Sequence, residues 1–186
     1  MVRRVHDDLR AAGVQEQYLQ ITSEGYLIAE LPGTTGLEAA PKVALFSHVD
    51  TARDFLGDGV VPVVHRNYSG EVIAFAKGPE GMVLDPAMFP VLASKVGDTI
   101  ITANGDTLLG ADDKSGVAVM VALAELLLKR QLPHGPLALA FGPDEEVRSR
   151  SSLGSYTGVR PMDSSLRNTP ELTLCEWRSA RRSGTA

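Results

Sequence analysis

Three short segments of the chain place a side chain that can bind a metal beside a second carboxylate. They are Ser47-His48-Val49-Asp50-Thr51, Gly110-Ala111-Asp112-Asp113-Lys114 and Pro143-Asp144-Glu145-Glu146. Each follows an apolar run or contains a glycine turn, so each is expected at the end of a strand or the start of a helix. Histidine, aspartate and glutamate supplied from three such places predict a hydrolytic site that holds two metal ions.

The first segment follows an apolar run at residues 43–46, which predicts a strand buried on both faces of a sheet. His48 emerges at the end of that strand. Asp50 is two residues further on, so in extended backbone both side chains point the same way. This spacing suits an imidazole metal ligand that a carboxylate holds in place. On its own, the pair also fits a loop histidine next to a solvated aspartate.

The second segment lies directly before a strongly apolar helix expected at residues 115–129. Adjacent carboxylates at a helix N-terminus can be simple caps, because the helix dipole favours anions there. A carboxylate on a glycine-flanked turn can also bridge two metals with its two oxygens. Asp112 and Asp113 alone fit both interpretations.

The third segment follows a second buried run at residues 137–141. One of two adjacent glutamates can ligate a metal while its neighbour takes a proton from metal-bound water, whose pKa coordination lowers. Glu145 and Glu146 also fit an ordinary surface loop. The coincidence of all three segments in one short chain favours the metal site.

The elements around these segments predict an α/β fold. A buried strand, a long connection, a buried helix and a second buried strand place functional residues at the strand ends of one sheet. The helix at 115–129 is apolar nearly all round, so we expect it to be largely buried. Further elements are expected as a helix at 2–12 ended by Gly13, a β-hairpin of 18–22 and 26–31, and a β-like run at 99–102.

Composition limits the partners that the protein can have. The 186 residues are 44% hydrophobic and carry a net charge of −5, which suits about one domain and gives no electrostatic case for nucleic acid or an anionic membrane. No apolar run is long enough to cross a bilayer. A lone Cys175 predicts a reducing, cytoplasmic location and leaves any metal to His, Asp and Glu.

Residues 148–186 differ in composition from the rest. They hold seven of the 18 basic residues, all of them arginine, but only three of the 23 acidic residues. We therefore expect two parts, a catalytic-domain part at 1–147 and a tail at 148–186 that packs poorly. An arginine- and serine-rich tail without lysine is also what out-of-frame translation of a GC-rich gene produces. Sequencing the coding DNA around codon 148 tests that hypothesis.

The three segments resemble the M20 zinc-peptidase family. Two further stretches, Met88-Phe89-Pro90-Val91-Leu92 and Pro133-His134-Gly135, are similar to its tripeptide-cleaving members. The resemblance runs from about residue 13 to residue 147, in order and with compatible spacing. It implies an M20-type catalytic domain, in which a mixed sheet is flanked by helices.

The resemblance also implies roles for single residues. His48 would bind one zinc ion, Asp112 would bridge two, and Glu146 would bind the other. Glu145 would act as the general base and Asp50 would support His48. The family usually has a cis peptide after the bridging aspartate, here between Asp112 and Asp113. The implied reaction removes the N-terminal residue from tripeptides; a dipeptidase or an amino-acid deacylase is the alternative within the family.

The resemblance stops after Val147. The family's further zinc-binding aspartate, its smaller lid domain used in dimer contacts and a distant histidine ligand find no match in this sequence. We therefore expect an incomplete catalytic domain without a lid, and homodimers only if a lid were present. Three ligands for two zinc ions also leave open a non-catalytic remnant, so we expect this fragment to be impaired or inactive.

Overall fold

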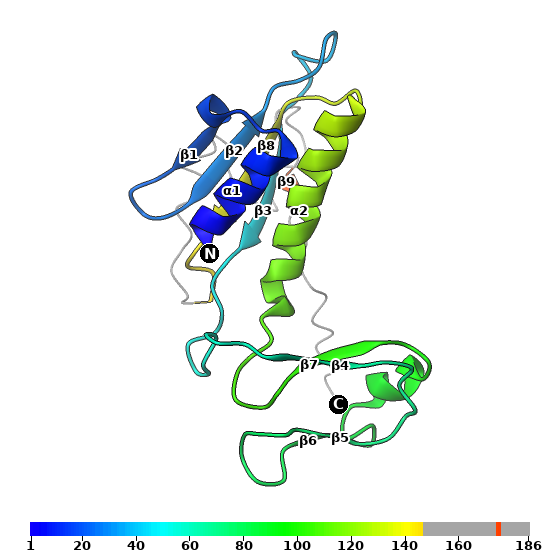
Figure 1. Ribbon diagram of the computed structural model, residues 1–186. Helices are drawn as coiled ribbons and strands as arrows, with labels where there is room; N and C mark the ends of the chain where they lie inside the picture. The colour runs from blue at the N-terminus through cyan, green and yellow to red at the C-terminus, as the bar shows by residue number, and fades with distance from the viewer. Residues whose placement is uncertain (147–173, 176–186) are drawn as a thin grey trace, which may run out of the picture. The chain divides into compact units, whose positions relative to one another are not determined.

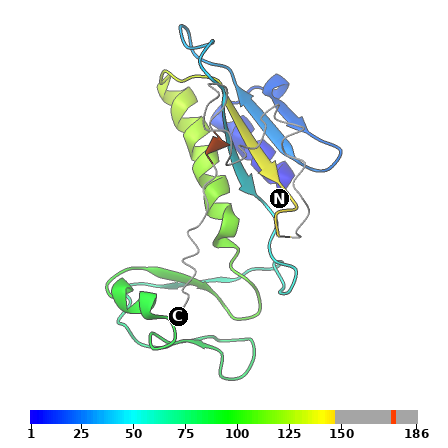
Figure 2. The same ribbon diagram turned by 180° about the vertical axis from the view of Figure 1, so that it is seen from behind.

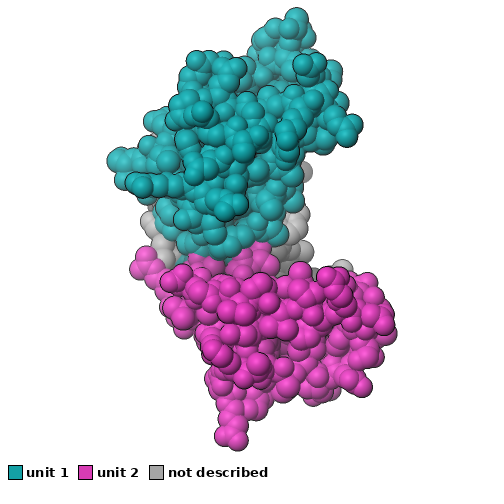
Figure 3. Space-filling view, viewed as in Figure 1, with its two compact units in different colours: residues 1–50, 112–186 teal, residues 51–111 magenta. Residues whose placement is uncertain are grey.

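The computed structural model describes residues 1–146 and 174–175 of the chain. It divides into two compact units, one of residues 1–50 with 112–186 and one of residues 51–111 (Figure 3). The residues that would test a boundary at 147 lie almost entirely outside the described part. The division at 147 and the poor packing of the tail therefore stay predictions.

The first unit is built on a five-stranded mixed sheet, in the order β1-β2-β8-β3-β9. Its strands are β1 (Leu19–Ile21), β2 (Leu27–Leu31), β3 (Val43–His48), β8 (Leu137–Gly142) and β9 (Leu174–Cys175). The expected hairpin is present, because β1 pairs with β2 in antiparallel fashion. β2 pairs with β8 in antiparallel fashion, whereas β3 runs parallel to both β8 and β9. The predicted mixed α/β architecture is confirmed.

The parallel pairing of β3 with β8 brings two of the three segments to one edge of the sheet. The register aligns Val43 with Leu137 and His48 with Gly142, so both strands end at the same level. The ladder continues one step further, because the Val49 N–H donates to the Gly142 carbonyl at 2.8 Å. Residues 48–50 and 143–146 therefore leave the sheet side by side.

Two helices, α1 (Val2–Ala12) and α2 (Ala111–Arg130), cover one face of this sheet (Figures 1 and 2). α1 ends at Gly13, whose φ of 109° is left-handed, as the sequence predicts. Alternate strand residues face the helices because side chains of a strand point to opposite faces. The core between them includes Val5, Leu9, Leu27, Ala29, Leu31, Val117, Met120, Ala124, Leu139 and Phe141.

The expectation that α2 is largely buried is wrong. Of its apolar residues only Val117, Met120 and Ala124 are buried, while Val119 is 67% and Leu126 48% exposed. The helix lies on the sheet by one side only, and an all-apolar sequence does not tell which sides are covered. β3 differs in the same way, since several of its apolar side chains are only half-buried.

The opposite face of the sheet carries a smaller apolar cluster. Tyr26, Ile28 and Ala140 are buried there, with Phe46 packed against them. Tyr26 directly precedes β2, and Ala140 lies on the neighbouring strand β8. The rings of Tyr26 and Phe46 lie close to Gly142, the last residue of β8.

The second unit is made of short strands. β4 (Pro62–His65) pairs with β7 (Ile100–Ala103), and β5 (Ile73–Ala74) pairs with β6 (Val83–Leu84). Tyr68, Ile73 and Leu92 form its small core. Short 3₁₀ helices complete the structure, η1 (Glu16–Tyr18) in the first unit and η2 (Pro90–Lys95) in the second. Among the described residues, none of the helices is both long and apolar enough to cross a membrane.

Candidate metal centre

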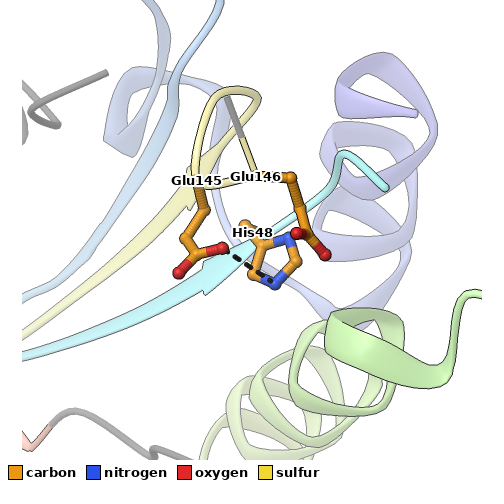
Figure 4. A group of neighbouring side chains, drawn as sticks. All are labelled: His48, Glu145 and Glu146. Atoms are coloured by element: carbon orange, nitrogen blue, oxygen red, sulfur yellow. Dashed lines mark ion pairs between the residues drawn. The ribbon is translucent and has the colours of Figure 1, made fainter. Parts of the chain in front are cut away.

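The three segments identified from sequence meet in the first unit, where β3 and β8 end and α2 begins. His48, Glu145 and Glu146 each offer one potential ligand atom, and these atoms lie within 4.8 Å of one another (Figure 4). His48 comes from the last position of β3, whereas both glutamates come from the turn after β8. The parallel register of the two strands is what brings them together.

His48 is only 6% exposed and is oriented by contacts on both sides of its ring. Its Nδ1 lies 3.2 Å from the Asp50 carbonyl oxygen. Its Nε2 lies 3.1 Å from Asp112 Oδ1 and 3.9 Å from Glu145 Oε2. A proton on Nδ1 bound to Asp50 leaves Nε2 available as a ligand, which is the arrangement that metal-binding histidines use.

The electrostatics of the site favour positive charge at the ring. Burial lowers the pKa of His48, but the hydrogen bond with Asp112 and the charges of Asp50, Glu145 and Asp113 outweigh burial and raise it above 6.5. A single imidazole is thus surrounded by carboxylates. Such a cluster is suited to a cation, either the ring's own proton or a metal ion.

The two adjacent aspartates of the second segment face different surroundings. Regular helix begins only after them, since Asp112 (φ −89°, ψ 109°) and Asp113 (φ −119°, ψ 31°) are not helical. The peptide bond between them is cis, as the resemblance implies. The Asp112 side chain is 67% exposed and contacts His48. The Asp113 carboxylate is buried and accepts the Ser47 hydroxyl at 2.6 Å.

Asp50 connects the first segment to the third. Its Oδ2 accepts the backbone N–H of Glu146 at 3.0 Å. Its Oδ1 is buried, lies 3.3 Å from His48 Nδ1 and has no hydrogen-bond partner in the described part of the chain. The Asp50 carboxylate thus touches both the ring and the backbone of a second ligand candidate.

The structure brings together all five residues singled out from sequence: His48, Asp50, Asp112, Glu145 and Glu146. The residue common to their contacts is His48, whereas the sequence predicts Asp112 at the centre. Sequence reasoning missed Ser47 and Asp113 as a pair. Glycine at position 116, inside an apolar helix, was the available signal: a Cβ there would lie 2.5 Å from Asp113 Oδ1.

The donor set fits zinc. One imidazole nitrogen and carboxylate oxygens are ligands that zinc accepts, and the atoms are close enough together to share an ion. Asp112 reaches the same imidazole from the other side of the site. The individual roles of these residues remain predictions.

Comparison with known proteins agrees with the resemblance seen in the sequence. No protein-family model matches the chain. Peptidase T of Pectobacterium atrosepticum is 42% identical over 147 residues, which are 79% of this chain and 35% of the relative. Peptidase T of Brevibacillus brevis is 45% identical over 141 residues, 75% of this chain and 33% of the relative. The chain therefore spans about a third of the length of these curated relatives.

A solved structure supports the fold. Aminopeptidase PepT from Bacillus cereus superimposes with a TM-score of 0.52 at 22% sequence identity, covering 78% of this chain and 31% of the other. At this identity the match bears on the fold alone. The sequence comparisons thus confirm similarity to peptidase T over most of this chain and a part of each relative, and the solved structure confirms the fold.

Proposed function

We propose that this chain carries part of the active site of a zinc-dependent aminopeptidase that removes the N-terminal residue from tripeptides. The observation that supports the proposal most is the meeting of His48, Glu145 and Glu146 within 4.8 Å, at the sites where the sequence resembles the M20 family. The curated relatives named peptidase T support the same activity. Peptide substrates and a cytoplasmic location belong to this proposal.

The site residues would have separate roles in zinc binding and proton transfer. His48, Asp112 and Glu146 would hold zinc, with two ions expected per site. When bound, zinc supplies Lewis-acid polarisation of the scissile carbonyl. The exposed Glu145 carboxylate, 3.9 Å from His48 Nε2, would accept a proton from the water that attacks the scissile carbonyl and pass it to the leaving amine. Asp50 would keep the Nδ1 proton of His48 in place.

A second candidate is that the 186-residue chain binds metal without catalysis. One observation favours it: the described residues bring a single histidine and four carboxylates to the site, and one of these, Asp50, already accepts the Glu146 N–H. Two zinc ions with about four ligands each would ask for more donors than these. From this chain alone we therefore expect zinc binding with little or no tripeptide hydrolysis.

A chimera tests the proposed activity independently of the chain's own turnover. Residues 13–147 would replace the matching segment of Brevibacillus brevis peptidase T, and release of N-terminal residues from a tripeptide would be measured with and without zinc. We expect zinc-dependent turnover that Glu145→Ala abolishes. Glu125→Ala, on the exposed side of α2, is the control. A folded, zinc-loaded chimera with no turnover would contradict the proposal.

A further inference from the structure

A buried tyrosine hydroxyl reaches the segment that carries the two glutamates. Tyr26 is 1% exposed, and its hydroxyl donates to Asp144 Oδ1 at 2.5 Å. Asp144 directly precedes Glu145 and Glu146. The sequence pattern marks Tyr26 only as a strand residue and gives it no part in the site.

The backbone of Tyr26 is held firmly in the hairpin between β1 and β2. Its N–H donates to Thr22 Oγ1 at 3.2 Å, and its carbonyl accepts the Thr22 N–H at 2.8 Å. The ring packs with Ile28, Ala140 and Phe46 on the sheet face opposite the helices. Because backbone and ring are both fixed, the position of the hydroxyl is fixed too.

A glycine makes room for this approach. Gly142 is the last residue of β8, and a Cβ there would lie 2.8 Å from Tyr26 Cε1 and 2.8 Å from Phe46 Cε2. Any side chain at this position would push the two rings away from the strand. Gly25, in the turn of the hairpin, lies close to Pro143: a Cβ added at Gly25 would lie 3.6 Å from Pro143 Cγ. The hairpin therefore runs along the turn at residues 143–146.

We propose that Tyr26 is a positioning residue for the metal centre. It fixes Asp144, and through Asp144 the turn that presents Glu145 and Glu146 to His48. The turn is thereby tied at two points, to Tyr26 through Asp144 and to Asp50 through the Glu146 N–H. Loss of either tie lets the turn open at one end. The expected effect on zinc affinity rests on the proposed function, whereas the effect of the Tyr26–Asp144 hydrogen bond on the turn does not.

Tyr26→Phe removes the hydroxyl and keeps the ring. We expect hydrogen exchange at the Glu146 amide to become about tenfold faster, because the turn loses a hydrogen bond to a charged group. Zinc affinity should fall about tenfold, the lower end of the loss expected when a residue that orients a ligand is removed. Exchange in the β2 and β8 amides should stay unchanged.

Tyr68→Phe is a matched control. Tyr68 is also buried, and its hydroxyl also donates to a nearby acceptor, the Glu71 carbonyl at 2.6 Å, but it belongs to the second unit. Its loss should leave Glu146 exchange and zinc affinity unchanged.

Variants of Asp144 test the other partner of the hydrogen bond. Asp144→Asn, which keeps an acceptor oxygen, should retain most of the parent's exchange protection, and Asp144→Ala should match Tyr26→Phe. In the Tyr26→Phe and Asp144→Ala double variant, the Glu146 amide should exchange no faster, and zinc should bind no more weakly, than in either single variant.

Two results would overturn the proposal whether or not zinc binds. One is unchanged Glu146 exchange in Tyr26→Phe. The other is exchange that rises equally throughout β2 and β8, which would give the hydroxyl only a general stabilising role. If the parent chain bound no zinc while the exchange response held, the proposed function would fail and the tie between Tyr26 and the turn would stand.

Discussion

At the level of single residues, the site is an imidazole among acids. His48 has Asp50 on its Nδ1 side and Asp112 and Glu145 on its Nε2 side. The same neighbours that would complete a metal site favour protonation of the ring when metal is missing. Proton and zinc therefore compete for His48 Nε2, and both the stability and the metal affinity of the chain depend on pH.

The raised pKa of His48 gives the zinc-free chain a definite pH dependence. A raised folded-state pKa contributes stability that is fully present below the unfolded value, near 6.5, and is lost as pH rises through the folded-state value. Thermal unfolding of the zinc-free chain should therefore occur at lower temperature as pH rises through this range. His48→Gln should flatten that part of the profile. An identical profile in the variant would contradict the assignment.

The Ser47 hydroxyl stabilises a buried charge. Ser47→Ala removes the 2.6 Å hydrogen bond to Asp113 Oδ2. We expect the free energy of unfolding to fall by about 1.5–3 kcal/mol, the usual contribution of a hydrogen bond to a charged group. Urea denaturation measures this change. Ser94→Ala, whose exposed hydroxyl bonds the Val91 carbonyl, should have an effect within about 0.5 kcal/mol; equal effects of both substitutions would show that the buried bond contributes nothing special.

At the level of elements, the start of α2 is shaped around Asp113. Glycine is normally a poor helix residue, and alanine in its place gains about 1 kcal/mol. At position 116 a Cβ would lie 2.5 Å from Asp113 Oδ1, so the carboxylate would have to move away from Ser47. At position 116 the contact with Asp113 therefore favours glycine, although helix propensity favours alanine.

Gly116→Ala should therefore destabilise the chain. The lost hydrogen bond exceeds the gain in helix propensity, so we expect a net loss of about 0.5–2 kcal/mol in urea denaturation. Val119→Ala serves as the control, because Val119 lies exposed on the same helix and should lose little or gain slightly. A more stable Gly116→Ala variant would show that Asp113 shifts without cost.

The positions of the main helices and strands were largely predictable from sequence, but which of their sides are buried was not. Apolar runs at 43–46 and 137–141 predicted β3 and β8, and their shared sheet predicted that His48 and Glu146 would be neighbours. The exposure of Val119 was not predictable, since residue type does not tell which side of a helix is covered. The sequence also does not distinguish the adjacent acids Asp112 and Asp113, because their side chains point in different directions only through the local backbone conformation.

At the level of the whole molecule, much apolar surface is exposed. The second unit exposes Phe55, Leu56 and Met88, and α2 exposes Val119. Exposed apolar groups of this size promote association between copies. Sedimentation velocity should show apparent mass rising with protein concentration, and less so in a Phe55→Ser, Leu56→Ser double variant. A constant monomer mass over the whole concentration range would contradict this prediction.

Calorimetric titration of the metal-free chain with zinc measures whether His48, Glu146 and their carboxylate neighbours hold the ion. We expect saturable zinc binding that grows stronger as His48 loses its proton. His48→Ala and Glu146→Gln should each weaken it by more than about 100-fold, beyond the effect of losing a supporting residue. Glu125→Gln, which removes an exposed carboxylate paired with Lys129 on α2, should leave it unchanged. Absence of saturable binding, or equal affinity in the parent and both site variants, would show that these residues do not form a zinc site.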